Sequence, residues 1–199
     1  MKQYLAIDIG GTAVKLGIVD ETGAVGSKAE ESVNFDGYQT PVLATVLKAA
    51  KAFVETQNID VNTLEGVGVS ATGQIDSRKG IVAGTCGNFP NYINSPIQAE
   101  LERLFGLPVT VANDANCMTL GEVWVGGAKG YTDVIGVTLG TGVEWNDFTI
   151  DFAYCHMWIN PTSYDDTDGH GILDSGYITG GTSKDTVANI YMLSFGYKF

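Results

Sequence analysis

Cysteine is scarce in this sequence. Only Cys86, Cys117 and Cys155 occur among 199 residues, and they lie too far apart to form a CxxC metal-binding pair. Small secreted domains that are held together by disulfides use more cysteines than this. We therefore expect no disulfide framework, and we interpret the three thiols as buried or unreactive.

Positive charge is scarce as well, because 11 lysines and arginines stand against 23 aspartates and glutamates, for a net charge of -12. A nucleic-acid-binding protein neutralises backbone phosphates with a basic surface, and binding to an anionic membrane surface also needs positive charge. The composition therefore excludes nucleic acid as an expected partner. It is compatible with an acidic enzyme that acts on a neutral metabolite.

Long apolar runs are missing too, and no segment reaches the length of a transmembrane helix. The first residues, MKQYLAIDIGGT, carry one lysine and a short apolar run that ends at Asp8, without a cleavage site. This predicts a first β-strand and no signal peptide. We expect a cytoplasmic protein; the alternative is the outer membrane, if residues 143–199 reflect the true context.

The pattern of apolar residues predicts a layered α/β domain up to Gly142. Apolar runs and alternation predict strands at residues 4–9, 13–19, 24–33, 66–71, 109–112 and 132–139. Helical spacing predicts helices at residues 41–56, 96–105 and 114–125. Three successive strands followed by alternating helices and strands are typical of an α/β layer structure.

A glycine turn follows the first expected strand, in the segment DIGGTAVK. Gly10 and Gly11 bring backbone N–H groups to the surface, and such a nest binds phosphate oxygens. Thr12 adds a hydroxyl donor, and Asp8 can hold Mg²⁺ directly or through water. Lys15 can help to neutralise the phosphate. The alternatives are an ordinary glycine hairpin beside an acidic residue, and a solvated lysine.

A second glycine turn of the same form is expected at the end of strand 132–139. It contains Gly140, Thr141 and Gly142, and it would hold a nucleotide from the other side. Two such turns in one chain favour phosphate binding over two structural hairpins.

Asp114 stands between the two turns, where an expected strand leads into an expected helix. Phosphoryl transfer needs a base within hydrogen-bond reach of the attacking hydroxyl, and one aspartate is sufficient. Asn88 and Asn113 carry amides that donate and accept at once, as sugar hydroxyls require. The alternative is that Asp114 or Asn113 only caps the helix.

Five segments together resemble one known family: DIGGTAVK, VGVSATGQIDSRKG, GNFPNY, PVTVANDANCMTLGEVWVGGAKG and VTLGTG. Their order and spacing make residues 1–142 similar to the N-terminal half of a ROK family sugar kinase (repressor, open reading frame, kinase) of the bacterial glucokinase type. This resemblance implies an actin-like, ribonuclease H-like ATPase fold. It also implies phosphorylation of a glucose-like hexose by ATP with Mg²⁺, so that a small sugar and ATP are the expected partners. The repressor branch carries a helix-turn-helix ahead of this domain, and none is expected before Tyr4.

The resemblance also implies roles for individual residues. Asp114 corresponds to the base that deprotonates the primary hydroxyl of the sugar. Asn88 and Asn113 correspond to sugar contacts, with Gly73 in the loop beside them. The two phosphate segments correspond to Gly10, Gly11 and Thr12 and to Gly140, Thr141 and Gly142.

The resemblance stops at Gly142. The family continues with further glycines, an acidic residue and a Gly-His pair, which in many members accompanies a zinc site with cysteines. Here Gly169 and His170 follow Asp168 without a cysteine group, so we expect no zinc site. About half of the kinase is missing. An enzyme of this kind closes two lobes over its substrate, and one lobe alone cannot enclose it. We therefore expect impaired or absent activity, and the alternative is a catalytically dead module that binds nucleotide or sugar.

Residues 143–199 resemble a different kind of protein. Alternating aromatic and small or polar residues in WNDFTIDFAYCHMWIN and ANIYMLSFGYKF predict a long antiparallel β-hairpin of outer-membrane-barrel type, similar to the long-chain fatty-acid transporter family. The terminal Phe199, with Tyr197 and Phe195, is similar to the C-terminal aromatic signature of such barrels. The alternative is an ordinary amphipathic hairpin.

Two strands cannot close a barrel, so we expect neither membrane insertion nor transport from this chain, and a barrel fragment remains an alternative. We interpret the chain as a chimera of a domain at 1–142 and an unrelated tail at 143–199, natural or artificial. The apolar strand at residues 188–199 has an unpaired edge, which predicts self-association or aggregation.

Overall fold

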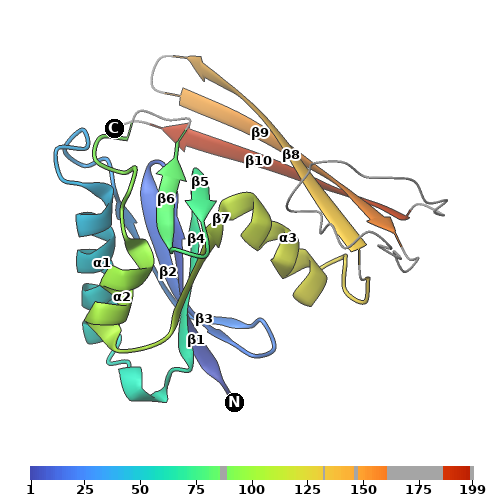
Figure 1. The fold of residues 1–199 in the computed structure, drawn as a ribbon. Coiled ribbons are helices and arrows are strands. Elements are labelled where there is room, and N and C mark those ends of the chain that lie inside the picture. The colour runs from blue at the N-terminus through green and yellow to red at the C-terminus, as the bar shows by residue number, and fades with distance from the viewer. Residues whose placement is uncertain (86–88, 132, 146–147, 161–185, 198–199) are drawn as a thin grey trace. The chain divides into compact units, whose positions relative to one another are not determined.

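A computed structural model of the chain describes residues 1–85, 89–131, 133–145, 148–160 and 186–197 (Figure 1). These residues form two compact units, Met1–Cys117 and Met118–Phe199. Each unit is described by itself. The helix α3 (Asp114–Trp124) begins in the first unit and ends in the second.

A five-stranded mixed sheet lies at the centre of the first unit (Figure 1). In spatial order its strands are β3 (Val25–Ser32), β2 (Ala13–Asp20), β1 (Gln3–Ile9), β4 (Gly66–Ala71) and β7 (Val109–Asn113). The pairs β1–β4 and β4–β7 are parallel, whereas β2 is antiparallel to both β1 and β3. Short turns join the antiparallel strands, and the chain returns to the parallel ones through helical crossovers.

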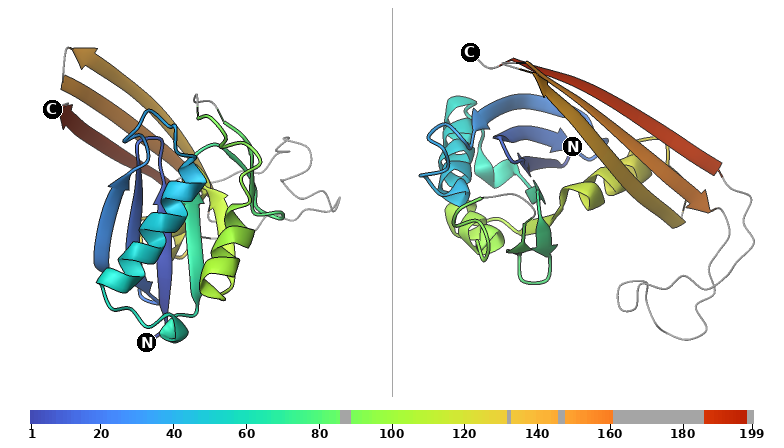
Figure 2. Two further views of the ribbon diagram at one scale, coloured as in Figure 1. Left: turned by 90° about the vertical axis from the view of Figure 1, so that its left-hand side faces the viewer. Right: turned by 90° about the horizontal axis from the view of Figure 1, so that it is seen from above.

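The helices α1 (Val42–Thr56) and α2 (Ile97–Phe105) lie side by side over one face of this sheet (Figure 2). That face is apolar because side chains alternate along a strand: Leu5, Ile7 and Ile9 of β1 are buried, while Asp8 between them is half-buried on the opposite face. Burial of this alternating set against the two helices forms the hydrophobic core.

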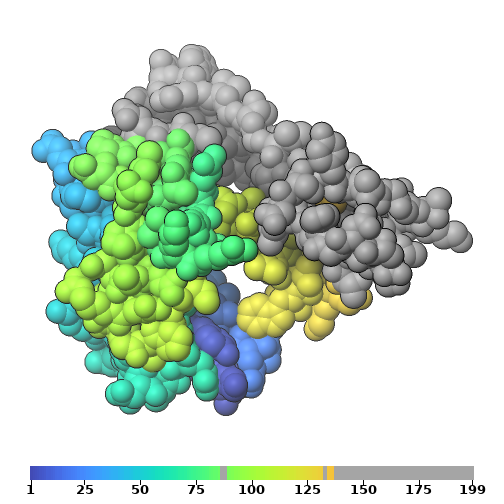
Figure 3. Space-filling model, in the orientation of Figure 1, coloured from blue at the N-terminus to red at the C-terminus, as the bar shows by residue number. Residues whose placement is uncertain are grey.

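A short hairpin and one turn of 3-10 helix were not predicted from the sequence. The hairpin consists of β5 (Gln74–Asp76) and β6 (Ile81–Gly84), and the 3-10 turn η1 spans Val61–Thr63. The hairpin packs against α2, and both lie on the face that the space-filling view shows in green (Figure 3). The backbone N–H of Gln98 donates to the carbonyl of Gly80 at 3.1 Å. Elements of three or four residues are too short to show a hydrophobic period.

The second unit contains a three-stranded antiparallel sheet of β8 (Asp133–Trp145), β9 (Phe148–Asn160) and β10 (Thr186–Tyr197), in the order β10-β9-β8. β8 is longer than predicted. Gly140, Thr141 and Gly142 continue the strand instead of ending it in a turn, because Ala153, Phe152 and Asp151 of β9 pair with them.

The pairing of β8 with β9 also changes the expected two-stranded tail. β9 pairs with β8 along its whole length, so the described strands form a meander of three and not a separate hairpin of two. The boundary predicted between Gly142 and Val143 falls inside β8, and it stays a prediction. Within the part of the chain that the structure describes, β10 is an edge strand with β9 as its single partner.

Two further sequence-based expectations cannot be followed. Asp168, Gly169 and His170 and the terminal Phe199 lie outside the described residues. Of the helices that the structure does describe, none combines the length and the apolar character needed to cross a membrane.

We predict that the α2 contact contributes strongly to the stability of the first unit. Leu101 is 0% exposed, so Leu101→Ala should lower the free energy of unfolding by about 2–5 kcal/mol, since it leaves a cavity. Leu104 on the same helix is 36% exposed, and Leu104→Ala should cost less than about 1 kcal/mol. Urea unfolding followed by circular dichroism at the helix band measures both. Equal losses would contradict the packing described for α2.

Candidate functional site

The candidate site lies where three parallel strands end. The carboxyl ends of β1, β4 and β7 point to the same edge of the sheet, because all three strands run in one direction. The chain leaves β1 at Gly10, β4 at Thr72 and β7 at Asp114. In open α/β sheets, ligands bind at this edge. The predicted phosphate turn, the Gly73 loop and the predicted base therefore meet at one edge because of topology alone.

The turn at residues 10–12 is held by hydrogen bonds on both sides. The N–H of Gly10 donates to the carbonyl of Ala13 at 2.9 Å, and the carbonyl of Thr12 accepts from the N–H of Val33 at 2.9 Å. The hydroxyl of Tyr38 donates to the carbonyl of Gly11 at 2.6 Å. Thr12 itself is exposed, as a phosphate ligand must be.

Asp8 and Lys15 lie beside this turn on neighbouring strands. Oδ1 of Asp8 accepts a hydrogen bond from the Ser70 hydroxyl at 2.8 Å, which fixes the carboxylate at the end of β1. Lys15 is exposed and lies directly opposite Asp8 in the β1–β2 register, with Glu30 opposite it on β3. The lysine can therefore face a phosphate or balance two carboxylates, and its phosphate role stays a prediction.

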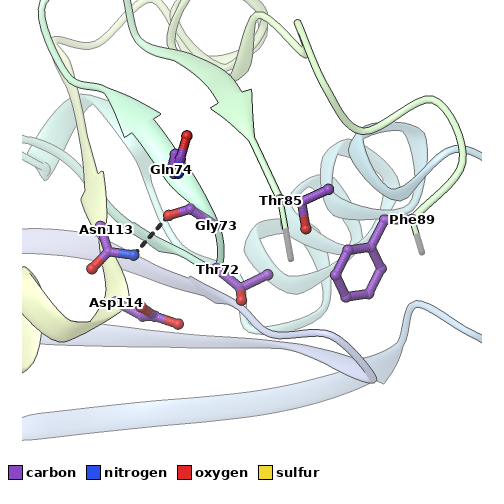
Figure 4. A pocket seen from close by; sticks show the side chains of 7 residues that line it. All are labelled: Thr72, Gly73, Gln74, Thr85, Phe89, Asn113 and Asp114. Carbon is purple, nitrogen blue, oxygen red and sulfur yellow. Dashed lines mark hydrogen bonds between the residues drawn. The ribbon is translucent and has the colours of Figure 1, made fainter. Parts of the chain in front are cut away.

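A pocket of about 330 Å³ opens at the same edge of the sheet (Figure 4). Seven residues line it: Thr72, Gly73, Gln74, Thr85, Phe89, Asn113 and Asp114. Its volume lies at the lower end of the range for small-molecule sites, about 300–1,000 Å³. The lining combines one aromatic ring with hydroxyl, amide and carboxylate groups, which can donate to and accept from the hydroxyls of a small polar ligand.

Asn113 connects the β4–β5 loop to α3. Its Nδ2 donates to the carbonyl of Gly73 at 2.7 Å (Figure 4). Its Oδ1 accepts from the N–H groups of Ala115 at 3.0 Å and Asn116 at 3.4 Å. The helix-capping alternative considered for this residue is therefore what the structure shows. One N–H of the amide remains for a ligand, so capping and sugar contact are compatible.

Asp114 is exposed at the first position of α3, where its Oδ1 accepts from the N–H of Ala115 at 2.8 Å. Its charge acts on two neighbours. Burial raises the pKa of the Tyr92 hydroxyl, and Asp114 adds to that rise. Burial likewise raises the pKa of the Cys117 thiol, an interaction with Ser70 opposes the rise, and the charges of Asp8 and Asp114 reinforce it. Asp8 and Asp114 lie at the same edge of the sheet because β1, β4 and β7 are parallel.

The donor set fits a Mg²⁺ ion only together with other ligands. Among the described residues, no group of three or more His, Cys, Asp or Glu side chains is placed to hold a metal ion. Asp8 would therefore supply one oxygen, and phosphate oxygens and water would supply the others, as is usual for Mg²⁺ in phosphoryl-transfer sites.

The structure brings together most, but not all, of the predicted site residues. Those in the first unit are Asp8, Gly10, Gly11, Thr12, Lys15, Gly73, Asn113 and Asp114. Asn88 lies outside the described residues, and Gly140, Thr141 and Gly142 belong to the second unit, so their roles stay predictions.

Four pocket residues were not predicted as site residues: Thr72, Gln74, Thr85 and Phe89. Thr72 and Gln74 flank Gly73 in the segment ATGQ, and Phe89 lies in GNFPNY. Both segments carried the family resemblance, and that was the signal available for three of the four. Nothing in the sequence distinguishes Thr85 from other surface threonines.

Comparison with known proteins gives one family for most of the chain. The model of the ROK family matches residues 4–144. A glucokinase of Thermotoga maritima is 32% identical over 141 residues, which cover 71% of this chain and 43% of the relative. A beta-glucoside kinase of Listeria innocua is 36% identical over 145 residues, which cover 72% of this chain and 46% of the relative. The chain thus spans less than half the length of these curated relatives.

Solved structures show the same likeness. A ROK family glucokinase from Streptomyces griseus, in complex with glucose and AMPPNP, has a TM-score of 0.57 at 28% identity, over 79% of this chain and 44% of that chain. An inorganic polyphosphate/ATP-glucomannokinase from Arthrobacter sp. strain KM has a TM-score of 0.57 at 26% identity, over 80% of this chain and 58% of that chain. The predicted α/β fold of the actin-like ATPase class is thereby confirmed.

We predict that Gly73 cannot be replaced without loss of stability. Its φ is +97°, and a Cβ there would lie 2.6 Å from the carbonyl oxygen of Gly84. Gly73→Ala should therefore cost about 1–3 kcal/mol of unfolding free energy. Gly68→Ala is the matched control, because a Cβ at Gly68 meets nothing within 4 Å, and it should change stability by less than about 0.5 kcal/mol. Urea unfolding compares the two, and an unaffected Gly73→Ala protein would contradict this geometry.

We also predict that Asn113 stabilises the start of α3. Asn113→Ala removes the cap and the bond to Gly73, and it should lower the free energy of unfolding by about 1–2 kcal/mol. Asn116 is exposed in the same first turn, and Asn116→Ala should have an effect below about 0.5 kcal/mol. Thermal unfolding of both variants measures the difference. A loss that is no larger at Asn113 than at Asn116 would exclude the capping role.

Proposed function

This chain belongs to the ROK family, and on that premise we propose that it holds a glucose-like hexose and the phosphates of ATP for phosphorylation of the sugar. The single observation that carries the proposal is the pocket in which Asp114, Asn113 and Gly73 meet Phe89. A Cβ at Gly11 would lie 3.1 Å from the ring of Phe89, so the pocket adjoins the phosphate turn.

The reaction assigns one task to each group. The sugar hydroxyl binds to the carboxylate of Asp114, which takes its proton as the hydroxyl oxygen bonds to the γ-phosphorus. The bond from that phosphorus to the bridging oxygen of ADP breaks in the same displacement. The backbone N–H groups of Gly11 and Thr12 and the Thr12 hydroxyl hold phosphate oxygens, since the N–H of Gly10 is used within the turn. Asp8 would hold the Mg²⁺ ion. ATP supplies the phosphoryl group, and Mg²⁺ neutralises its charge.

Two relatives support a glucose-like substrate. The Thermotoga maritima protein is a glucokinase, and the Streptomyces griseus structure contains glucose and AMPPNP. The pocket residues Asn113 and Thr72 supply an amide and a hydroxyl, which pair with the hydroxyls of a hexose. We therefore place a glucose-like hexose in the pocket, with its primary hydroxyl at Asp114.

A second candidate function is binding of nucleotide or sugar without turnover. It is favoured by the pocket at the end of β7, whose amide and hydroxyl groups can hold a sugar whether or not a phosphoryl group is transferred. The impaired activity expected from the sequence stays a prediction. The likeness of residues 143–199 to barrel strands, and with it the chimeric origin, stays a prediction, since the family match ends at residue 144.

A coupled assay for ADP release with a panel of hexoses tests the activity. If the chain turns over, Asp114→Asn should lower the rate by about 100-fold or more, because general-base catalysis contributes about 10²–10⁴. Glu65→Gln removes an exposed carboxylate next to the amino end of β4, and its rate should equal that of the unchanged protein.

Full activity in the Asp114→Asn variant would exclude Asp114 as the base. If no hexose gives ADP, the kinase activity of this chain fails. Calorimetric titration with MgATP and with glucose then decides the second candidate function, because a binding module still releases or takes up heat.

A further inference from the structure

Three aromatic rings form a cluster beside the phosphate turn. The rings of Tyr38 and Phe89 meet edge to face with centroids 5.5 Å apart, and the rings of Phe89 and Tyr92 do so at 5.8 Å. Such pairs contribute about 0.5–1.5 kcal/mol beyond the area that they bury. The cluster therefore links the loop that contains Tyr38 to the segment that contains Phe89 and Tyr92.

Two members of the cluster touch the phosphate turn at the same residue. The Tyr38 hydroxyl donates to the carbonyl of Gly11 at 2.6 Å, and a Cβ at Gly11 would come within 3.1 Å of Phe89. Phe89 also lines the pocket in which the sugar is placed. The third member, Tyr92, is buried, and its hydroxyl donates to the carbonyl of Thr72 at 3.1 Å and not to the turn at residues 10–12.

The bond from Tyr38 determines the orientation of one peptide group. The carbonyl of Gly11 and the N–H of Thr12 belong to the same planar trans peptide, so they point in opposite directions. When the carbonyl is held by Tyr38, the N–H of Thr12 is directed away from Tyr38. An N–H group that is held in place before the ligand arrives binds an anion without the entropic cost of ordering the turn.

The backbone at Tyr38 is in an unusual conformation that permits this bond. Tyr38 has a φ of +62° and follows Gly37 with a φ of +67°. A bulky residue with positive φ is strained, and such strain persists only where the surroundings enforce it. Here Asp36 enforces it, because its carboxylate accepts from the N–H and the hydroxyl of Thr40 at 2.9 and 2.7 Å. These bonds, that of the Thr40 hydroxyl first, also lower the pKa of the Asp36 carboxyl.

We propose that Tyr38 is a positioning residue for the nucleotide phosphates, which acts through its hydroxyl on the Gly11–Thr12 peptide group. The inference rests on the proposed function, because it takes residues 10–12 as the phosphate-binding turn. Tyr38 does not line the pocket; its ring contacts Phe89, whereas its hydroxyl bonds only the turn. The hydroxyl therefore contributes to the affinity for MgATP and not to the affinity for the sugar.

Calorimetric titration of the full chain with MgATP and, separately, with glucose tests this role. Tyr38→Phe removes one hydroxyl and keeps the ring, so the Kd for MgATP should rise about 3- to 10-fold, the value of one hydrogen bond. The Kd for glucose should stay within about twofold, less than the loss of one hydrogen bond, because the Tyr38 hydroxyl bonds the turn and Tyr38 does not line the pocket. Tyr92→Phe is the matched control, because it removes a hydroxyl from the same cluster without touching Gly11, and MgATP affinity should not change.

Two further measurements separate positioning from general loosening. Thermal unfolding establishes that both variants are folded. The amide resonance of Thr12 in a ¹⁵N–¹H spectrum should shift in Tyr38→Phe and not in Tyr92→Phe, because only the first variant frees the peptide group.

The possible outcomes distinguish the role of Tyr38 from the proposed function. Unchanged MgATP affinity in Tyr38→Phe, or equal losses in both variants or for both ligands, would overturn the inference while the proposed function stands. Absence of MgATP binding by the unchanged chain would overturn the inference together with the phosphate role of residues 10–12. Binding of MgATP that depends on Tyr38, without ADP formation from any hexose, would support the inference while the kinase activity fails.

Discussion

The parallel pairing of β1, β4 and β7 is the constraint on which the rest of the first unit depends. Parallel strands deliver their carboxyl ends to one edge, so the residues that follow Ile9, Ala71 and Asn113 come together although they are far apart in the sequence. The apolar face of these strands must be covered, and α1 and α2 cover it. The edge is left for polar chemistry, and all the described site residues lie at or beside it.

The loops at this edge are fixed by a few specific bonds and not by burial alone. Asn113 ties the Gly73 loop to the start of α3, while Tyr38 and Val33 hold the turn at residues 10–12. Short loops that are held by side-chain bonds keep their geometry before a ligand binds, which is the condition for strong interaction with a charged transition state. The pocket and the turn at residues 10–12 are therefore both held in place within the first unit.

The regular elements of the first unit could be predicted from the sequence, because apolar periodicity reports directly on burial. The strand at 66–71 coincides with β4, and the helix expected at 41–56 coincides with α1 to within one residue. The β5–β6 hairpin was not predicted because its strands are too short to show a hydrophobic period. The length of β8 was not predicted for another reason. Gly140 and Gly142 favour a turn locally, but pairing with β9 holds them in a strand.

The sequence by itself determined the chemical groups of the site and the order in which the chain presents them. Asp8, the glycines at 10 and 11, and the pair Asn113 and Asp114 are recognisable because few residue types perform these tasks. Only the tertiary structure decided which groups meet, that the Asn113 amide caps α3 while it holds Gly73, and that Tyr38 reaches the carbonyl of Gly11. The hydrophobic pattern of the sequence indicates which side of a helix or strand is buried. Contacts between distant loops depend instead on the order of strands in the sheet and on backbone conformations such as the positive φ of Tyr38.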